Sequence, residues 1–228
     1  MFSHPHHQRI FKLLSALDAD CLRQCECFFG GGTAIVMLLG EYRESRDIDF
    51  LCSSVEGYRT IRNVVFDQGL KGLFKERVRE LREVRSDQYG VRSVLEIDGV
   101  AIKFEIVREG RIALVGGNNL ELPVQALSRI DLFAEKLLAN TDRFNDEAVT
   151  SRDLIDLAMM IEFWDGIPRE AWDKAKAAYG ESAVQAFLKG IKFLSRPQYF
   201  ARCCETLMID ETVQSLILPA LQKERKKI

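Results

Sequence analysis

The chain has 228 residues, of which 47% are hydrophobic and 29% are charged. This is the composition of an ordinary globular protein rather than of a disordered or fibrous one. Its 32 Lys and Arg residues nearly balance its 34 Asp and Glu residues, and the formal net charge is −2. A protein that coats nucleic acid would need a large basic excess, so this class is excluded, although a local basic groove is allowed.

Membrane insertion is also excluded by the pattern of apolar residues. The longest uninterrupted apolar run, residues 34–39, is far shorter than the ~20 residues that a membrane-spanning helix needs. The first residues contain no apolar segment of signal-peptide length. We therefore expect a cytoplasmic protein without a membrane partner.

The six cysteines contain no CxxC pair, so they are predicted to be buried, reduced thiols rather than zinc ligands.

The chain divides into two parts with different patterns. Up to about residue 124, short runs typical of strands alternate with helical runs, whereas the sequence beyond Ser128 is almost wholly helical. Pro123 marks the approximate boundary, which predicts an α/β domain at residues 1–122 and a helical domain at residues 123–228. In the first domain, helices are predicted at residues 5–19 and 34–39, and strands at residues 25–29, 47–52, 91–97 and 100–107.

Two short patterns predict local structure in the first domain. Ser53 and Glu56 have the spacing of a capping box, which predicts the start of a helix. Asp98-Gly99 separates two alternating apolar runs and is a strong hairpin signal. In the second of these runs the apolar residues share one face, so Lys103 and Glu105 lie on the opposite face.

Residues 29–50 combine two features that are weak alone and specific together. Glycines at the end of a strand expose backbone N–H groups, and a helix that begins at Thr33 directs the positive end of its dipole to the same place. Asp47 and Asp49 are two positions apart on a strand, so both carboxylates leave one face. They repel each other unless a cation lies between them, and carboxylate oxygens suit Mg²⁺, which bridges protein carboxylates and phosphates. This combination predicts nucleotide chemistry.

The order of these residues resembles the first motif of the polymerase-β-like nucleotidyltransferase superfamily. Gly31-Gly32-Thr33 is followed by Arg43, Ser45 and the segment Asp47-Ile-Asp-Phe. More narrowly, the pattern is similar to that of the AbiEii/AbiGii toxin family of nucleotidyltransferase-like proteins. Tyr42 stands where many members of that family have histidine, a difference that we expect to matter little.

A second group of residues supports the narrower resemblance. Lys136, Arg143 and Arg152-Asp153-x-x-Asp156-Leu157 look like the family's helical lysine, its downstream arginine and its Lys/Arg-Asp-x-x-Asp-Leu pattern. The resemblance covers about residues 28–160, without a recognisable motif between residues 54 and 90. It implies an α+β fold, in which a mixed sheet flanked by helices precedes a helical C-terminal domain that closes the cleft.

The resemblance also implies a reaction. A nucleotidyltransferase of this superfamily moves a nucleoside monophosphate from an NTP to an acceptor hydroxyl group and releases pyrophosphate, with three carboxylates that hold two Mg²⁺ ions, or Mn²⁺ in their place. Asp47 and Asp49 match the first two carboxylates. We expect Glu105 to be the third, as a metal ligand and candidate base, with Glu96 and Asp98 on the neighbouring strand as alternatives.

The resemblance further implies which residues bind the nucleotide and its phosphates. Lys136 borders an apolar helical stripe, so it would either reach the triphosphate or extend over core surface into water. Asp153 would orient Lys136 or Arg152, cap its helix or meet the substrate, whereas Asp156 is as readily structural. The expected nucleotide-binding residues are Gly31, Gly32, Thr33, Arg43, Ser45, Lys136, Arg152 and Asp153.

Two functions of different class follow. The first is an active nucleotidyltransferase that acts on RNA resembling tRNA or on a protein, with a small molecule as a further acceptor class. The resemblance makes such an enzyme the toxin of a toxin–antitoxin or phage-defence pair, with a cognate antitoxin protein as partner. The second is a catalytically inactive nucleotide-binding or protein-interaction module on the same fold. The intact Asp47 and Asp49 pair favours the enzyme.

Overall fold

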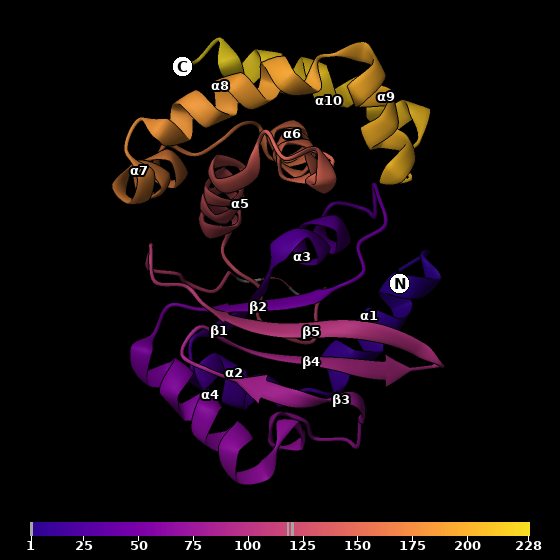
Figure 1. Ribbon diagram of the computed structural model, residues 1–228, viewed down its shortest axis with the longest axis vertical. Coiled ribbons are helices and arrows are strands. Elements are labelled where there is room, and N and C mark those ends of the chain that lie inside the picture. The colour runs from indigo at the N-terminus through magenta and orange to yellow at the C-terminus, as the bar shows by residue number, and fades with distance from the viewer. Residues whose placement is uncertain (1, 118, 120) are drawn as a thin grey trace. The chain divides into compact units, whose positions relative to one another are not determined.

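The structure is a computed structural model that describes residues 2–117, 119 and 121–228. It confirms the predicted α+β class, with one mixed sheet, helices beside it and a helical C-terminal part (Figure 1). The chain forms two compact units, Met1–Ala34 with Ser45–Ser128, and Ile35–Glu44 with Arg129–Ile228. The first unit therefore ends at Ser128 rather than at residue 122, and a ten-residue excursion after Ala34 belongs to the helical unit.

Five strands form the sheet of the first unit, in the order β1-β2-β5-β4-β3. The pair β2–β5 is parallel, and the other neighbouring pairs are antiparallel. β5 is the middle strand, so both of its edges are bonded. The strands are β1 (Cys27–Gly30), β2 (Ile48–Cys52), β3 (Arg79–Ser86), β4 (Gly90–Ile97) and β5 (Val100–Arg108).

The two faces of this sheet differ in polarity. One face carries fully buried aromatic side chains from three adjacent strands, Phe29, Phe50 and Phe104. The ring centroids of Phe29 and Phe50 are 5.6 Å apart, and those of Phe50 and Phe104 are 6.0 Å apart. Because side chains alternate along a strand, the residues between these aromatics, Asp49 and Glu105 among them, leave the other face.

Three α-helices of the first unit are α1 (Pro5–Ala16), α2 (Ala19–Gln24) and α4 (Val55–Gln68), and α2 and α4 contact the sheet (Figure 1). The single helix predicted at residues 5–19 is wrong at its end. Leu17 is extended, and the Asp18 side chain accepts a hydrogen bond from the Cys21 backbone N–H, so a second helix starts there. Asp side chains compete for backbone donors in this way and favour helix starts.

The predicted capping box is displaced by one residue. Ser54, not Ser53, caps α4 by accepting from the Gly57 backbone N–H at 3.2 Å. The Ser53 hydroxyl instead accepts from the Leu114 backbone N–H at 2.9 Å. Gly57 is required by close approach, because a Cβ at this position would lie 1.9 Å from the Cys25 carbonyl oxygen.

The hairpin prediction is confirmed, and one strand was missed. Asp98 and Gly99 have φ values of 49° and 76°, as a two-residue hairpin turn requires, and they join β4 to β5. β3 was not predicted because its sequence, Arg-Glu-Leu-Arg-Glu-Val-Arg-Ser, is mostly charged and exposed, with no alternation of polarity. Its ladder with β4 contains two register shifts.

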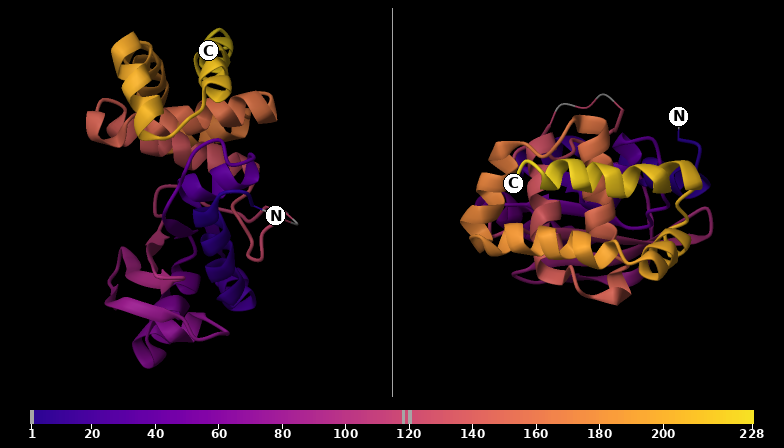
Figure 2. Two further views of the ribbon diagram at one scale, coloured as in Figure 1. Left: turned by 90° about the vertical axis from the view of Figure 1, so that its right-hand side faces the viewer. Right: turned by 90° about the horizontal axis from the view of Figure 1, so that it is seen from above.

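The second unit is helical, as predicted. Figure 2 shows α8 and α10 running across α5 and α6; α10 packs mainly against α6 and α8 against α5, while α5 also packs against α6 and α7. The helix α3 (Gly31–Leu38) begins in the first unit and ends in the second. None of the described helices is long and apolar enough to span a membrane. The helices of the second unit are α5 (Arg129–Arg143), α6 (Arg152–Trp164), α7 (Arg169–Tyr179), α8 (Ser182–Leu194), α9 (Pro197–Thr206) and α10 (Glu211–Arg225).

Candidate active site

The central feature of the first unit is a pair of carboxylates on adjacent parallel strands. Asp49 of β2 lies directly opposite Glu105 of β5. Residues paired in this way project from the same face of a sheet, with their Cβ atoms about 5 Å apart. Asp47 immediately precedes β2 and lies two positions before Asp49. The structure therefore brings Asp49 and Glu105 together on the polar face, with Asp47 in the segment that leads into β2, and the charges of all three act on Lys103.

The competing carboxylates lie elsewhere. Glu96 faces the same way as Glu105, but it is paired with Ala101, four positions along β5 from Glu105. At ~3.3 Å per residue this separates the two by about 13 Å along the strand. Glu96 is bonded instead to Arg79 at 2.8 Å, and Asp98 to Lys12 at 2.7 Å. Neither shares a site with Asp49.

Glu105 is held by two cations. Its Oε2 accepts from Lys103 Nζ at 2.6 Å, and its Oε1 lies 3.3 Å from Arg92 Nε. Burial would lower the pKa of Lys103, but the hydrogen bond to Glu105 and the negative charges of Glu105, Asp49 and Asp47 outweigh it and raise that pKa. Lys103 thus lies on the middle strand of the sheet rather than on an edge strand, with its side chain half exposed. It is an ammonium group within the field of three carboxylates.

The glycine turn lies against Asp49. Gly31 has a φ of 66°, and a Cβ at this position would lie 2.7 Å from Asp49 Oδ2 and 3.0 Å from Asp49 Cβ. Helix α3 begins at Gly31, two residues before the expected Thr33. Thr33 is almost fully buried, and its hydroxyl oxygen is 2.8 Å from that of Ser45. The backbone N–H of Ser45 donates to His7 Nε2 at 3.2 Å. The resemblance placed Thr33 and Ser45 at one site, and the structure brings them into contact.

Gly31→Ala is expected to reduce nucleotide transfer by about 10²-fold, because the added methyl group would displace the Asp49 carboxylate. Gly40→Ala is the matched control, since Gly40 also has a positive φ, 79°, but no atom lies within 4 Å of its added Cβ. Both variants should lose a similar ~1 kcal/mol of stability through the left-handed backbone. Steady-state kinetics and thermal melts of both variants check this, and equal activity of the two would contradict it.

The donor set fits a hard divalent cation only in part. Carboxylate oxygens of Asp47 and Asp49 are the ligands that Mg²⁺ prefers. However, among the residues that the structure describes, no three His, Cys, Asp or Glu side chains are grouped as a metal ion requires. The two oxygens of Glu105 are engaged by Lys103 and Arg92. Glu105 would join a metal site by giving up these bonds.

The second unit contains a separate, buried charge cluster. Asp156, fully buried on α6, accepts from Arg43 Nε at 2.8 Å, from Arg43 Nη2 at 2.9 Å and from the Tyr42 hydroxyl at 2.6 Å. Lys136 of α5 lies 2.7 Å from Asp156 Oδ2. Through this cluster Tyr42 and Arg43 are bonded to α6 of the helical unit, to which residues 35–44 belong. Tyr42, expected to matter little, is one of its members.

Asp153 is the second carboxylate of the cluster and pairs with two cations, Lys136 and Arg143. It lies 2.9 Å from Lys136 Nζ, and it accepts from Arg143 Nε at 2.6 Å and from Arg143 Nη2 at 3.0 Å. Lys136 is only 6% exposed and does not extend into water. Of the alternatives for Asp153, the structure supports the orientation of Lys136. Arg152 is exposed at the first position of α6.

The charges of this cluster lower the pKa values of its carboxyl groups. Burial alone would raise the pKa of Asp156, but Arg43 and Lys136 outweigh it and lower that pKa below 3.8. Burial is likewise overcome at Asp153, where Lys136 and Arg143 lower the pKa. Both aspartates are therefore ionised at neutral pH. Each carboxylate is bound by two cations, Asp156 by Arg43 and Lys136, and Asp153 by Lys136 and Arg143.

These depressed pKa values predict acid sensitivity of the helical unit. A carboxyl group whose pKa is lower in the folded than in the unfolded chain adds stability that is complete above the unfolded pKa, here near 3.8, and is lost as pH falls through the folded pKa. We expect the free energy of unfolding to decline below about pH 5. Urea titrations followed by fluorescence of Trp164 and Trp172, both in this unit, measure it. Asp153→Asn should show a shallower decline, and an unchanged slope would contradict this assignment.

Comparisons with known proteins identify the family of the chain and a similar fold. Residues 12–226 match the family model described as Nucleotidyl transferase AbiEii toxin, Type IV TA system, which includes the final third of the chain. The fold is similar to an antigenic nucleotidyltransferase-like protein from Paracoccidioides brasiliensis, with a TM-score of 0.51, 14% identity, and coverage of 89% of this chain and 94% of that one. A protein from H. pylori described as a nucleotidyltransferase gives a TM-score of 0.46, 16% identity and 95% coverage of both chains. Among curated proteins, none matches the sequence.

Proposed function

The chain belongs to the AbiEii family of nucleotidyltransferase toxins of type IV toxin–antitoxin systems, and we propose that it transfers a nucleoside monophosphate from an NTP to an acceptor hydroxyl group in a metal-dependent reaction. The observation that carries the proposal is the register that pairs Asp49 with Glu105 on adjacent parallel strands, with Asp47 two positions away. Asp49 and Glu105 share the sheet face opposite to the buried aromatic side chains of the core.

Mg²⁺, with Mn²⁺ as a substitute, would be held as a pair of ions by Asp47, Asp49 and Glu105, and would offset triphosphate charge and lower the pKa of the acceptor hydroxyl. Lys103 is 50% exposed and already lies beside these carboxylates. Its ammonium group would exchange Glu105 for a phosphate oxygen, which frees the Glu105 carboxylate as a ligand and as a base for the acceptor proton.

The start of α3 would bind the phosphates. Its first backbone N–H groups, at Gly31, Gly32 and Thr33, have no partners within the helix, and the positive end of the helix dipole lies there. Gly31 allows this helix end to approach Asp49 closely. The contact between Thr33 and Ser45 then holds the turn against the segment that leads into β2.

The buried cluster of the second unit carries an excess of positive charge. Arg43, Lys136 and Arg143 supply three positive charges against the two negative charges of Asp153 and Asp156. This excess, together with the exposed Arg152, would favour the binding of an anionic group by the helical unit itself. Asp153 acts in this proposal as a positioning residue for Lys136 rather than as a ligand of the nucleotide.

A hollow beside Glu105 favours a polyanionic acceptor. This cavity of about 620 Å³ is lined by Arg82 and Arg85 of β3, Arg92 of β4, and Lys103 and Glu105 of β5, together with neighbouring residues of these strands. The four cations outnumber the two carboxylates of the cavity, Glu83 and Glu105, and match a phosphodiester backbone, since phosphate contacts provide most of the non-specific affinity for nucleic acid. We therefore propose RNA resembling tRNA as the acceptor, with a protein hydroxyl as the competing class. The toxin would act in the cytoplasm and be opposed by a cognate antitoxin.

One observation favours a second function. Both oxygens of Glu105 are bound by Lys103 and Arg92, as in a site whose carboxylate serves only to neutralise cations. An inactive nucleotide-binding or protein-interaction module would need no more than this arrangement. It would bind NTP and leave it intact.

The test is to incubate the protein with each NTP, labelled at either the α- or the γ-phosphate, with total RNA, protein extract or small hydroxyl compounds, in Mg²⁺ or in excess chelator. The proposal predicts incorporation of α-label but not γ-label, into RNA, and only with Mg²⁺. Transfer of γ-label would identify a kinase-like reaction instead. NTP binding without any incorporation would favour the inactive module.

A further inference from the structure

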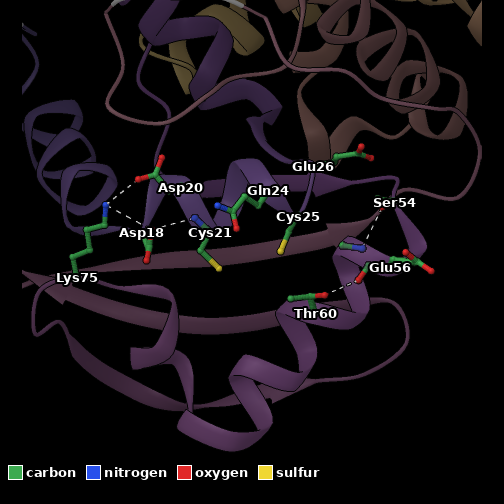
Figure 3. Close-up of a pocket in the computed structure, with 11 residues that line it drawn as sticks. Asp18, Asp20, Cys21, Gln24, Cys25, Glu26, Ser54, Glu56, Thr60 and Lys75 are labelled. Atoms are coloured by element: carbon green, nitrogen blue, oxygen red, sulfur yellow. Dashed lines mark hydrogen bonds and ion pairs between the residues drawn. The ribbon is translucent and has the colours of Figure 1, made fainter.

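Four cysteines of the first unit lie together on the helix-covered side of the sheet, opposite to the face that carries Asp49. Cys21 belongs to α2 and Cys25 is its C-terminal cap, and both line a cavity of about 660 Å³ with Ser54, the N-cap of α4, and Gly57 of α4 (Figure 3). Cys27 of β1 and Cys52 of β2 are fully buried beneath them. The Cys52 thiol lies 3.3 Å from the carbonyl oxygen of Cys25. Cys52 is therefore in direct contact with a residue that lines the cavity.

The register of β1 and β2 places two of these thiols face to face. Cys27 lies directly opposite Cys52 in this antiparallel ladder. Two positions further along β1, the Phe29 N–H donates to the Gln125 carbonyl and the Phe29 carbonyl accepts from Leu127, so Phe29 directs no backbone bond toward β2. Because bonded and non-bonded pairs alternate along an antiparallel ladder, Cys27 and Cys52 form a non-hydrogen-bonded pair as well.

This pair type satisfies the geometry of a disulfide. Its Cα atoms are ~4.5 Å apart, within the ~4.4–6.8 Å that disulfides span. The competing pair, Cys21 and Cys25, is spaced i, i+4 in a helical conformation, where Cβ atoms are ~5–6 Å apart, more than the ~3.5–4.5 Å that a disulfide allows. The two thiols are close enough to interact: the hydrogen-bonding influence of Cys27 is the main cause that lowers the pKa of Cys52, while burial raises the pKa of Cys27.

We propose that Cys27 and Cys52 form a redox-active dithiol that a hydroperoxide oxidises reversibly to a cross-strand disulfide. The Cys52 thiolate attacks one peroxide oxygen, the O–O bond breaks, and Cys52 becomes a sulfenic acid while the other oxygen leaves as water or alcohol after taking up a proton. The Cys27 sulfur then attacks the Cys52 sulfur and displaces the hydroxyl group as water. In total, two thiols and one hydroperoxide give one disulfide, one water and one water or alcohol.

The disulfide would link the strands that carry the proposed active site. Gly30, three residues after Cys27, is paired with Asp49, three residues before Cys52. A covalent bond between these strands removes conformational freedom from the unfolded chain, so the oxidised protein should be more stable than the reduced protein. Because the cross-link is detected directly, its existence can be tested whether or not the protein transfers nucleotides.

The test is to reduce the full-length protein, treat it with hydrogen peroxide, alkylate the remaining thiols after denaturation and map the peptides by mass spectrometry. We expect one dominant cross-linked peptide pair that contains Cys27 and Cys52 and is cleaved by dithiothreitol. The thermal midpoint of the oxidised protein should rise by several degrees Celsius and return on reduction.

Two variants sharpen the result. Cys27→Ala should leave Cys52 unable to form this cross-link and should abolish the rise of the thermal midpoint. Cys203→Ala, which removes a buried thiol of the helical unit, should leave both readouts unchanged. A Cys21–Cys25 disulfide in the wild-type protein, or oxidation of Cys203 and Cys204 at the same rate as Cys27 and Cys52, would overturn the proposal.

Discussion

Replacement of Asp156 by alanine is expected to lower the free energy of unfolding of the helical unit by about 3–5 kcal/mol, the range found when one partner of a buried ion pair is removed. Asp156 accepts hydrogen bonds from Arg43 and Tyr42 and an ion-pair contact from Lys136, and Arg43 and Lys136 are both nearly inaccessible to water. Without the carboxylate, two cations remain buried with Asp153 as the only acidic residue of the cluster.

Urea unfolding followed by tryptophan fluorescence measures this loss, because Trp164 and Trp172 are the two tryptophans of the chain and both belong to this unit. Asp173→Ala is the control. Asp173 is 64% exposed and lies 3.8 Å from Arg169, one helical turn away, so its removal should cost less than ~1 kcal/mol. A similar loss for both variants would show that the cluster is not a stabilising element.

Glu105→Gln is expected to reduce nucleotide transfer by at least ~10²-fold, the scale seen when a proton-transfer or charge-stabilising group is lost. Glu96→Gln should stay near wild type. The two residues form a matched pair, since both lie on the polar face of the sheet and both are bonded to exposed cations. Only Glu105 is in register with Asp49.

Rates of label incorporation and thermal midpoints should be recorded for both variants. Near-equal midpoints would show that any difference in rate is catalytic rather than structural. The reverse ranking of rates would place the third carboxylate on β4 instead of β5.

The face and register of Glu105 illustrate what local pattern can predict. Alternation along residues 101–107 leaves only one arrangement that buries Phe104, and a shift of one residue would exchange Phe104 with Glu105. The same alternation could not show that β5 lies beside β2, because strand order depends on contacts between distant segments. The pairing of Asp49 on β2 with Glu105 on β5 brings two carboxylates together on the polar face, and this makes the face a candidate site.

The charge cluster could not be predicted from pattern alone for a similar reason. Arg43 and Asp156 are 113 positions apart, and each has an ordinary local explanation, as a turn residue and as a polar residue on a helix. The family resemblance identified Arg43, Lys136 and Asp153 as important without showing that they meet. β3 was missed because tertiary pairing with β4 overrides a charged, exposed sequence.

The most direct measurement of the proposed function compares α-labelled NTP incorporation by the wild-type protein, Asp47→Asn and Asp49→Asn across a Mg²⁺ titration. The account predicts that both variants lose incorporation at every Mg²⁺ concentration while their thermal midpoints stay the same or rise, because each substitution removes one of two carboxylates that repel each other without a cation. Full incorporation by both variants, with unchanged dependence on Mg²⁺, would contradict catalysis at this face of the sheet.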